Sequence, residues 1–136
     1  MGNGTTTSAL FYGGDEGSNS KTLTEEFDGT NWTEVADLNT GRGYGAGIGA
    51  NAEEALCVGG LAHPSGNLAI CESWNGTAWT EVADLATARR AGGGGGVATS
   101  AILSGGSPNG SPPYSNSNAT EEFTAAEFQI KSVTTS

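Results

Sequence analysis

One phrase of this sequence occurs twice almost unchanged. The pattern Gly-Thr-x-Trp-Thr-Glu-Val-Ala-Asp-Leu closes residues 25–38 and again closes residues 72–85. Its tryptophans, Trp32 and Trp79, lie 47 residues apart. A period of that length matches one compact supersecondary unit, so the phrase indicates an array of structural repeats.

Two further landmarks show that the array has three units. An apolar run that ends in a glycine pair occurs three times, at Gly13-Gly14, Gly59-Gly60 and Gly105-Gly106. The tryptophan phrase also has a degenerate third copy, in which Phe128 takes the position that Trp79 has in the second copy. We therefore expect units over residues of about 1–38, 39–85 and 86–136.

Each unit contains four strand candidates. In the second unit these are a glycine-rich strand (43–50), an apolar strand ending at Gly60, an acidic and aromatic strand near Trp74, and the strand that begins at Trp79. Turns such as Asn75-Gly76 favour hairpins because both residue types tolerate positive φ. No segment shows a sustained helical period. The expected fold is all-β, with three four-stranded units the size of β-propeller blades.

Charge restricts the partners that we expect. The chain carries 15 acidic and 5 basic side chains, a formal net charge of −10. Nucleic acid is not an expected partner because phosphate binding needs a basic face. No apolar run is long enough to span a membrane, so a membrane is not an expected partner either. The first residues lack the basic and apolar regions of a secretory signal, which leaves a virion-associated or a cytoplasmic location open.

At these residues the sequence resembles a known repeat family. The apolar run, the glycine pair, the variable loop, the acidic and aromatic strand and the later tryptophan, with Arg42 or Arg89 opening the next unit, resemble the kelch repeat. The Asn/Asp-Gly-Thr-x-Trp-Thr-Glu-Val phrase is similar to kelch-like repeats in tail-associated and other structural proteins of environmental bacteriophages. The resemblance implies β-propeller blades and a viral structural protein.

The repeated positions suggest structural roles. Glycine-rich strands suit the crowded inner edge of a propeller, where backbones approach closely. Trp32 and Trp79 suit the core between stacked sheets. Arg42 and Arg89 have enough donors to reach backbone carbonyls or a carboxylate of an adjacent blade. The glutamates that recur from unit to unit, Glu26 and Glu122 among them, are expected to face solvent or such an arginine. The others are Glu25, Glu72 and Glu121.

Three blades are too few for a ring, since propellers usually have about four to eight. An open arc would expose apolar sheet faces that favour association. We expect two copies to pair head to tail as a homodimer that forms one six-bladed propeller. The short gap that the repeat offsets leave between one copy's end and the next copy's start agrees with this closure. Other closures, or a piece of a longer ring, remain alternatives.

The sequence motifs give little support for a catalytic function. His63 is the single histidine and lies in a loop beside a proline, so a solvated side chain is the simpler interpretation. No serine shows a motif-based partnership with a histidine and an aspartate. No acidic spacing typical of a calcium site appears. We expect no enzyme activity, no metal and no cofactor. The alternative is a hydrolase or lyase with its site on the propeller axis.

The two cysteines allow two interpretations. Counting inward along the hairpin places Cys57 and Cys71 near each other on adjacent strands, so a cross-strand disulfide is one alternative. The other is a pair of buried free thiols. The equivalent positions in the other units hold no cysteine.

Variable loops are where a propeller carries function. The candidates are 15–22, 61–69 and 107–119, and the last holds an aromatic among amides and hydroxyls, a combination that suits sugars. The expected function is a non-enzymatic binding or structural module whose loops contact a glycan or another virion protein. The alternative is an assembly fragment without a ligand. The loop candidates are His63, Asn67, Asn109, Tyr114 and Asn116.

Overall fold

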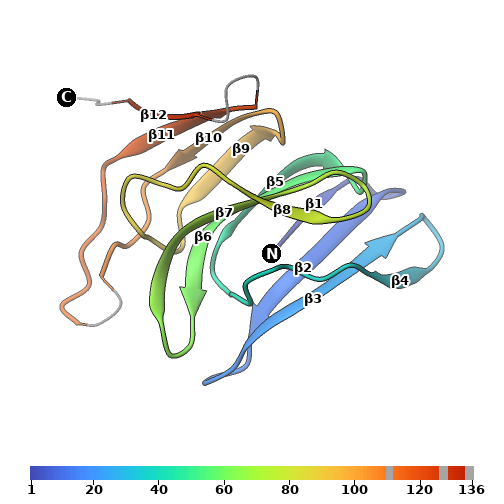
Figure 1. The fold of residues 1–136 in the computed structure, drawn as a ribbon, viewed down its shortest axis with the longest axis horizontal. Helices are drawn as coiled ribbons and strands as arrows, with labels where there is room; N and C mark the ends of the chain where they lie inside the picture. The colour runs from blue at the N-terminus through green and yellow to red at the C-terminus, as the bar shows by residue number, and fades with distance from the viewer. Residues whose placement is uncertain (110–111, 126–128, 134–136) are drawn as a thin grey trace.

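The computed structural model describes residues 1–109, 112–125 and 129–133, and every regular element in these ranges is a β-strand (Figure 1). The strands form three four-stranded antiparallel sheets, each built from four consecutive strands. The all-β expectation is confirmed. The first sheet holds β1 (Gly2–Gly4), β2 (Ala9–Asp15), β3 (Ser20–Phe27) and β4 (Trp32–Val35). The second holds β5 (Ala46–Asn51), β6 (Glu54–Ala62), β7 (Gly66–Trp74) and β8 (Trp79–Val82). The third holds β9 (Gly93–Val97), β10 (Ser100–Ser104), β11 (Thr120–Thr124) and β12 (Gln129–Val133).

The hairpins between the third and fourth strands close with the expected turn chemistry. Gly29 and Gly76 have φ of 96° and 89°, which glycine adopts without steric cost. In the first sheet, the residue before Gly29 stabilises the turn: Asp28 Oδ1 accepts hydrogen bonds from the backbone N–H groups of Asn31 and Thr30, at 2.7 and 2.8 Å. These two bonds lower the pKa of Asp28 because they favour its charged form.

Two boundaries differ from the sequence expectation. Most of the expected loop 61–69 is strand, because β6 and β7 keep pairing beyond the glycine pair as far as Ala62 opposite Gly66. The glycine-rich strand of the second sheet also begins later than expected, at Ala46 rather than at residue 43. Tyr44 and Ala91, at equivalent positions, have φ of 57° and 56°, and this left-handed conformation delays the start of extended pairing.

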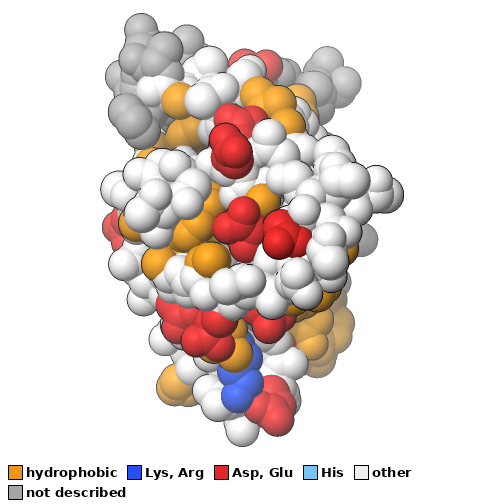
Figure 2. Space-filling view, turned by 90° about the vertical axis from the view of Figure 1, so that its right-hand side faces the viewer, with side chains coloured by type: hydrophobic (Ala, Val, Ile, Leu, Met, Phe, Trp, Pro, Cys, Tyr) orange, Lys and Arg blue, Asp and Glu red, His pale blue; other side chains and the backbone are white. Residues whose placement is uncertain are grey.

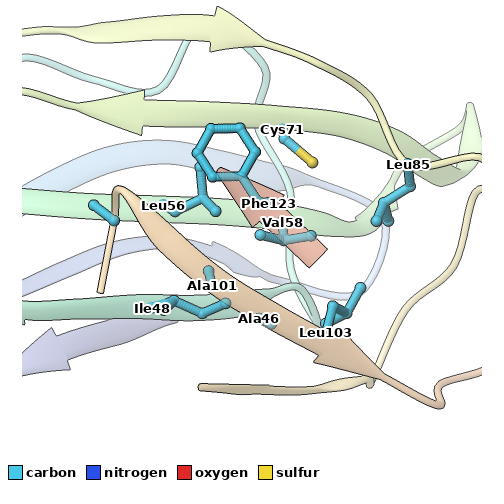
Figure 3. Close-up of a cluster of buried hydrophobic side chains, with 10 residues drawn as sticks. Ala46, Ile48, Leu56, Val58, Cys71, Leu85, Ala101, Leu103 and Phe123 are labelled. Atoms are coloured by element: carbon cyan, nitrogen blue, oxygen red, sulfur yellow. The ribbon is translucent and has the colours of Figure 1, made fainter. Parts of the chain in front are cut away.

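The sheets stack through two separate apolar layers. Each sheet has a front face, which carries Glu25, Glu72 or Glu121, and a back face on the other side. The back face of the first sheet packs on the front face of the second through Leu10, Tyr12, Ala55, Cys57, Trp74 and Trp79. The back face of the second packs on the front face of the third in the same way (Figure 3). The sheets therefore repeat one stacking mode in one direction.

The first strands of the three sheets converge. β1 lies against β5, and β5 lies against β9 (Figure 1). A Cβ atom on Gly47 would lie 2.7 Å from the carbonyl oxygen of Gly2 and 2.7 Å from Tyr12 Oη. Glycine is thus required where two strands of neighbouring sheets meet backbone to backbone.

We expect Gly47→Ala to lower the free energy of unfolding by about 1–3 kcal/mol, since the added methyl group would overpack β1 against β5. Gly95→Ala is the matched control, because nothing lies within 4 Å of a Cβ atom on this glycine of β9. Urea denaturation of the two variants measures the difference. Equal midpoints would contradict the close approach of β1 and β5.

Candidate functional site

The connector between the first and second sheets is bonded to both of them. Arg42 lies in this connector, and its backbone belongs to the first sheet: its N–H donates to Lys21 O at 3.1 Å, and its carbonyl accepts from Gly14 N at 2.8 Å. Its side chain is fully buried and points into the second sheet. One residue therefore joins two sheets, by its main chain to one and by its guanidinium to the other.

The Arg42 guanidinium has a partner for each of its nitrogens. Nη2 forms an ion pair with Glu72 on β7. Nη1 donates to Ile70 O at 2.6 Å, and Nε donates to Thr40 O at 3.1 Å. A register shift between Val58 and Gly60 leaves Ile70 outside the β6–β7 ladder, so its carbonyl is free for the arginine. The buried cation is compensated by a carboxylate and by carbonyls together.

Glu72 is equally well satisfied. This fully buried carboxylate accepts hydrogen bonds from the backbone N–H groups of Asn39 and Thr40, at 2.8 and 3.1 Å, and from Asn39 Nδ2 at 2.8 Å. These donors all belong to the connector. Glu72 is therefore the anchor on the second sheet for the whole segment that arrives from the first.

The second connector repeats this arrangement less completely. Arg89 is bonded through its backbone to the second sheet, by N–H to Leu68 O at 3.1 Å and by its carbonyl to Gly60 N at 2.9 Å. Its Nη2 lies 2.8 Å from Glu121 Oε1 of the third sheet, an ion pair not aligned as a hydrogen bond. Arg89 Nε has no hydrogen-bond partner among the described residues. The junction between the second and third sheets is thus the weaker copy.

The glycine pairs let the connectors lie across the sheets. Gly59 and Gly60 have φ of 57° and 111°, and Gly105 and Gly106 have φ of 71° and 92°. A Cβ atom on Gly59 would lie 2.6 Å from Arg89 O. The pair therefore combines a left-handed backbone with room for the arginine's own main chain. This link between the glycine pair and the arginine was missed in the sequence, where both appeared only as separate landmarks.

The repeated aromatic position has two different environments. Trp79 is buried between the first two sheets, 4.7 Å from the Tyr12 ring, and its Nε1 donates to Thr24 Oγ1 at 3.0 Å. Trp32 is 53% exposed on the front face of the first sheet, so within a single chain it does not occupy the expected core position. The reason is that no described sheet covers that face.

The third copy of this position is not where the sequence placed it. Phe128 lies outside the described residues. By strand register, Ile130 stands opposite Phe123 as Trp79 stands opposite Trp74. The alignment failed because the third unit is longer between its last two strands than the phrase it was matched to.

The two cysteines lie on opposite faces of the second sheet. Cys57 pairs in register with Glu72, and Cys71 pairs with Val58. The two cysteines therefore stand at neighbouring positions of the ladder rather than opposite each other. Cys57 belongs to the layer with the first sheet, and Cys71 to the layer with the third. Both are free, and burial raises the pKa of each thiol to about 12. The disulfide alternative is therefore wrong, because the sheet separates the two side chains.

The loop candidates belong in or beside the β6–β7 and β10–β11 connections, which lie at the lower left of Figure 1. Two of them join neighbouring sheets. His63 Nε2 lies 3.5 Å from Asp15 Oδ1, and the His63 N–H donates to Ser20 Oγ at 3.0 Å. Asn67 Nδ2 donates to Ser107 O at 2.9 Å. These contacts join the β2–β3, β6–β7 and β10–β11 connections of the three sheets. We call the surface that these connections form the loop edge.

The remaining candidates belong to the long connection between β10 and β11. Asn109 and Asn116 are exposed, and Asn109 Nδ2 donates to Pro113 O at 3.3 Å. Tyr114 is 63% exposed, and the Arg90 guanidinium lies 5.7 Å from its ring centroid. An exposed aromatic ring thus stands among amide groups at one end of the loop edge.

Within the described ranges, no group of three or more His, Cys, Asp or Glu side chains is placed to hold a metal ion. Among the same residues, no helix has the length and apolar character needed to cross a membrane. No model of a known protein family matches the sequence, and no curated protein matches it.

We expect Arg42→Ala to lower the free energy of unfolding by about 3–5 kcal/mol, because the variant leaves the Glu72 carboxylate buried without its cation. The double variant Arg42→Met/Glu72→Leu should recover most of this loss, since it removes both buried charges. Urea denaturation measures both.

Arg90→Ala is the control for this experiment. Its guanidinium lies over the exposed Tyr114 ring, and such a contact contributes only about 0.5–1 kcal/mol. If Arg42→Ala proves no more harmful than Arg90→Ala, the connector pair does not hold the sheets together.

Proposed function

We propose that this protein is a non-enzymatic binding and structural module in which the three sheets are kelch-like blades of a β-propeller. The observation that carries the proposal is the repeated stacking of back face on front face, with the first strands converging and glycine at their contact. Sheets arranged radially around an axis have this pattern. The resemblance of the sequence phrases to kelch-like phage repeats agrees with it.

The proposal includes a second copy that completes a six-bladed ring. The front face of the first sheet exposes Phe11, Leu23 and Trp32, and the back face of the third exposes Val97 and Ile102. Equivalent faces inside the chain are covered by a neighbouring sheet. Head-to-tail pairing would cover both ends by the same stacking mode.

The proposed ligand-binding surface is the loop edge. The Tyr114 ring offers an apolar face, and Asn109 and Asn116 offer donors and acceptors beside it. This combination suits a glycan, bound by stacking and hydrogen bonds, on a host surface or on another virion component. Figure 2 shows acidic side chains spread over another side of the molecule and basic side chains in one small patch, which disfavours nucleic acid as the partner.

Size-exclusion chromatography with light scattering tests the assembly. We expect one species of twice the 13.6 kDa chain mass, because pairing covers the apolar end faces. The measurement is made over a range of protein concentrations. A monodisperse species of 13.6 kDa at all of them would contradict the two-copy ring.

A glycan array tests the binding function. We expect selective binding that Tyr114→Ala abolishes, because the variant removes the exposed ring on which a sugar would stack. Ser115→Ala, in the same exposed loop, should bind as the parent protein does. If the parent protein binds no glycan, or if both variants bind equally well, the loop edge is not a glycan site.

A further inference from the structure

The front face of the first sheet repeats an arginine site that is filled in the other two sheets. Both connectors share the pattern Leu-x-Thr-x-Arg, at 38–42 and 85–89. Each ends in an arginine whose guanidinium meets the front-face glutamate of the next sheet, Glu72 or Glu121. Glu25 is the equivalent residue of the first sheet. It is exposed, and no described cation forms an ion pair with it.

The backbone around Glu25 also matches the filled site. In the second sheet, a register shift at Gly59 releases Ile70 O, which then accepts from Arg42. The first sheet has the same shift between Tyr12 and Gly14, and it places Leu23 where Ile70 stands in the second. The first sheet thus has both the carboxylate of Glu25 and the irregular strand pairing that hold the arginine in the second sheet.

The apolar surroundings are of the same kind. Phe11 and Trp32 flank Glu25 on the front face and are 51% and 53% exposed. Their equivalents in the second sheet, Cys57 and Trp79, are buried beneath the first sheet. A large aromatic area beside an unpaired carboxylate is complementary to a segment that combines a leucine with an arginine.

We propose that the front face of the first sheet is a receptor for a Leu-x-Thr-x-Arg segment of another polypeptide. Glu25 receives the guanidinium and the backbone N–H groups that precede it, as Glu72 does for the segment 38–42. The leucine packs beside the exposed aromatic side chains. The inference goes beyond the proposed ring, because it concerns a peptide segment rather than a second copy, and either holds without the other.

The test uses a labelled synthetic peptide with the sequence of residues 35–44 and follows its fluorescence anisotropy as the protein is added. We expect saturable binding that weakens at least tenfold with Glu25→Gln protein, and equally with a peptide in which Gln replaces the arginine. Glu34→Gln is the matched control. Glu34 faces Glu25 across the ladder, but its equivalent in the second sheet, Glu81, stays exposed.

Several outcomes would overturn the inference. One is equal affinity of the Glu25→Gln and Glu34→Gln proteins, and another is no saturable binding at millimolar concentrations. Thermal melts verify folding, and both variants should match the parent because both side chains are exposed.

Light scattering on the same samples separates this inference from the proposed ring. A dimer that excludes the peptide overturns the inference and leaves the two-copy ring standing. A monomer that binds the peptide through Glu25 supports the inference and contradicts the ring.

Discussion

The buried pair of Arg42 and Glu72 is the interaction on which the arrangement of the sheets depends. Removing two charges from water is costly, and only a complete set of partners offsets that cost. Here the carboxylate meets the guanidinium and two backbone N–H groups, while the arginine meets carbonyls as well. Because so many groups must be satisfied together, the connector has one path between the sheets.

Local sequence signals predicted the elements well, because each is set by a few neighbouring residues. Asn75-Gly76 closes a hairpin where turn chemistry required one, and its Asn75 side chain caps the turn as Asp28 does in the first unit. One failure came where strand pairing continued past the glycine pair. The β6–β7 ladder runs beyond Gly60 because the bulge there only shifts the register and does not end it.

The burial of individual side chains was far less predictable from the sequence than the secondary structure. Trp32 and Trp79 occupy the same place in the same phrase, yet one is exposed and the other buried. Glu25 and Glu72 differ in the same way. The sequence indicated that these glutamates face solvent or an arginine, and both situations occur within one chain. What decides between them is whether a neighbouring sheet covers the face, which no local pattern contains.

The double attachment of each connector has a thermodynamic consequence. In a linear array, stability is approximately a sum of terms within units and terms between nearest neighbours. Here the coupling terms pass through Arg42 and Arg89, and they are unequal because the second lacks part of its hydrogen bonding. We therefore expect the first two sheets to unfold as one cooperative block and the third sheet to open at the lowest free energy. Amide exchange in such a chain is graded along the sequence rather than uniform.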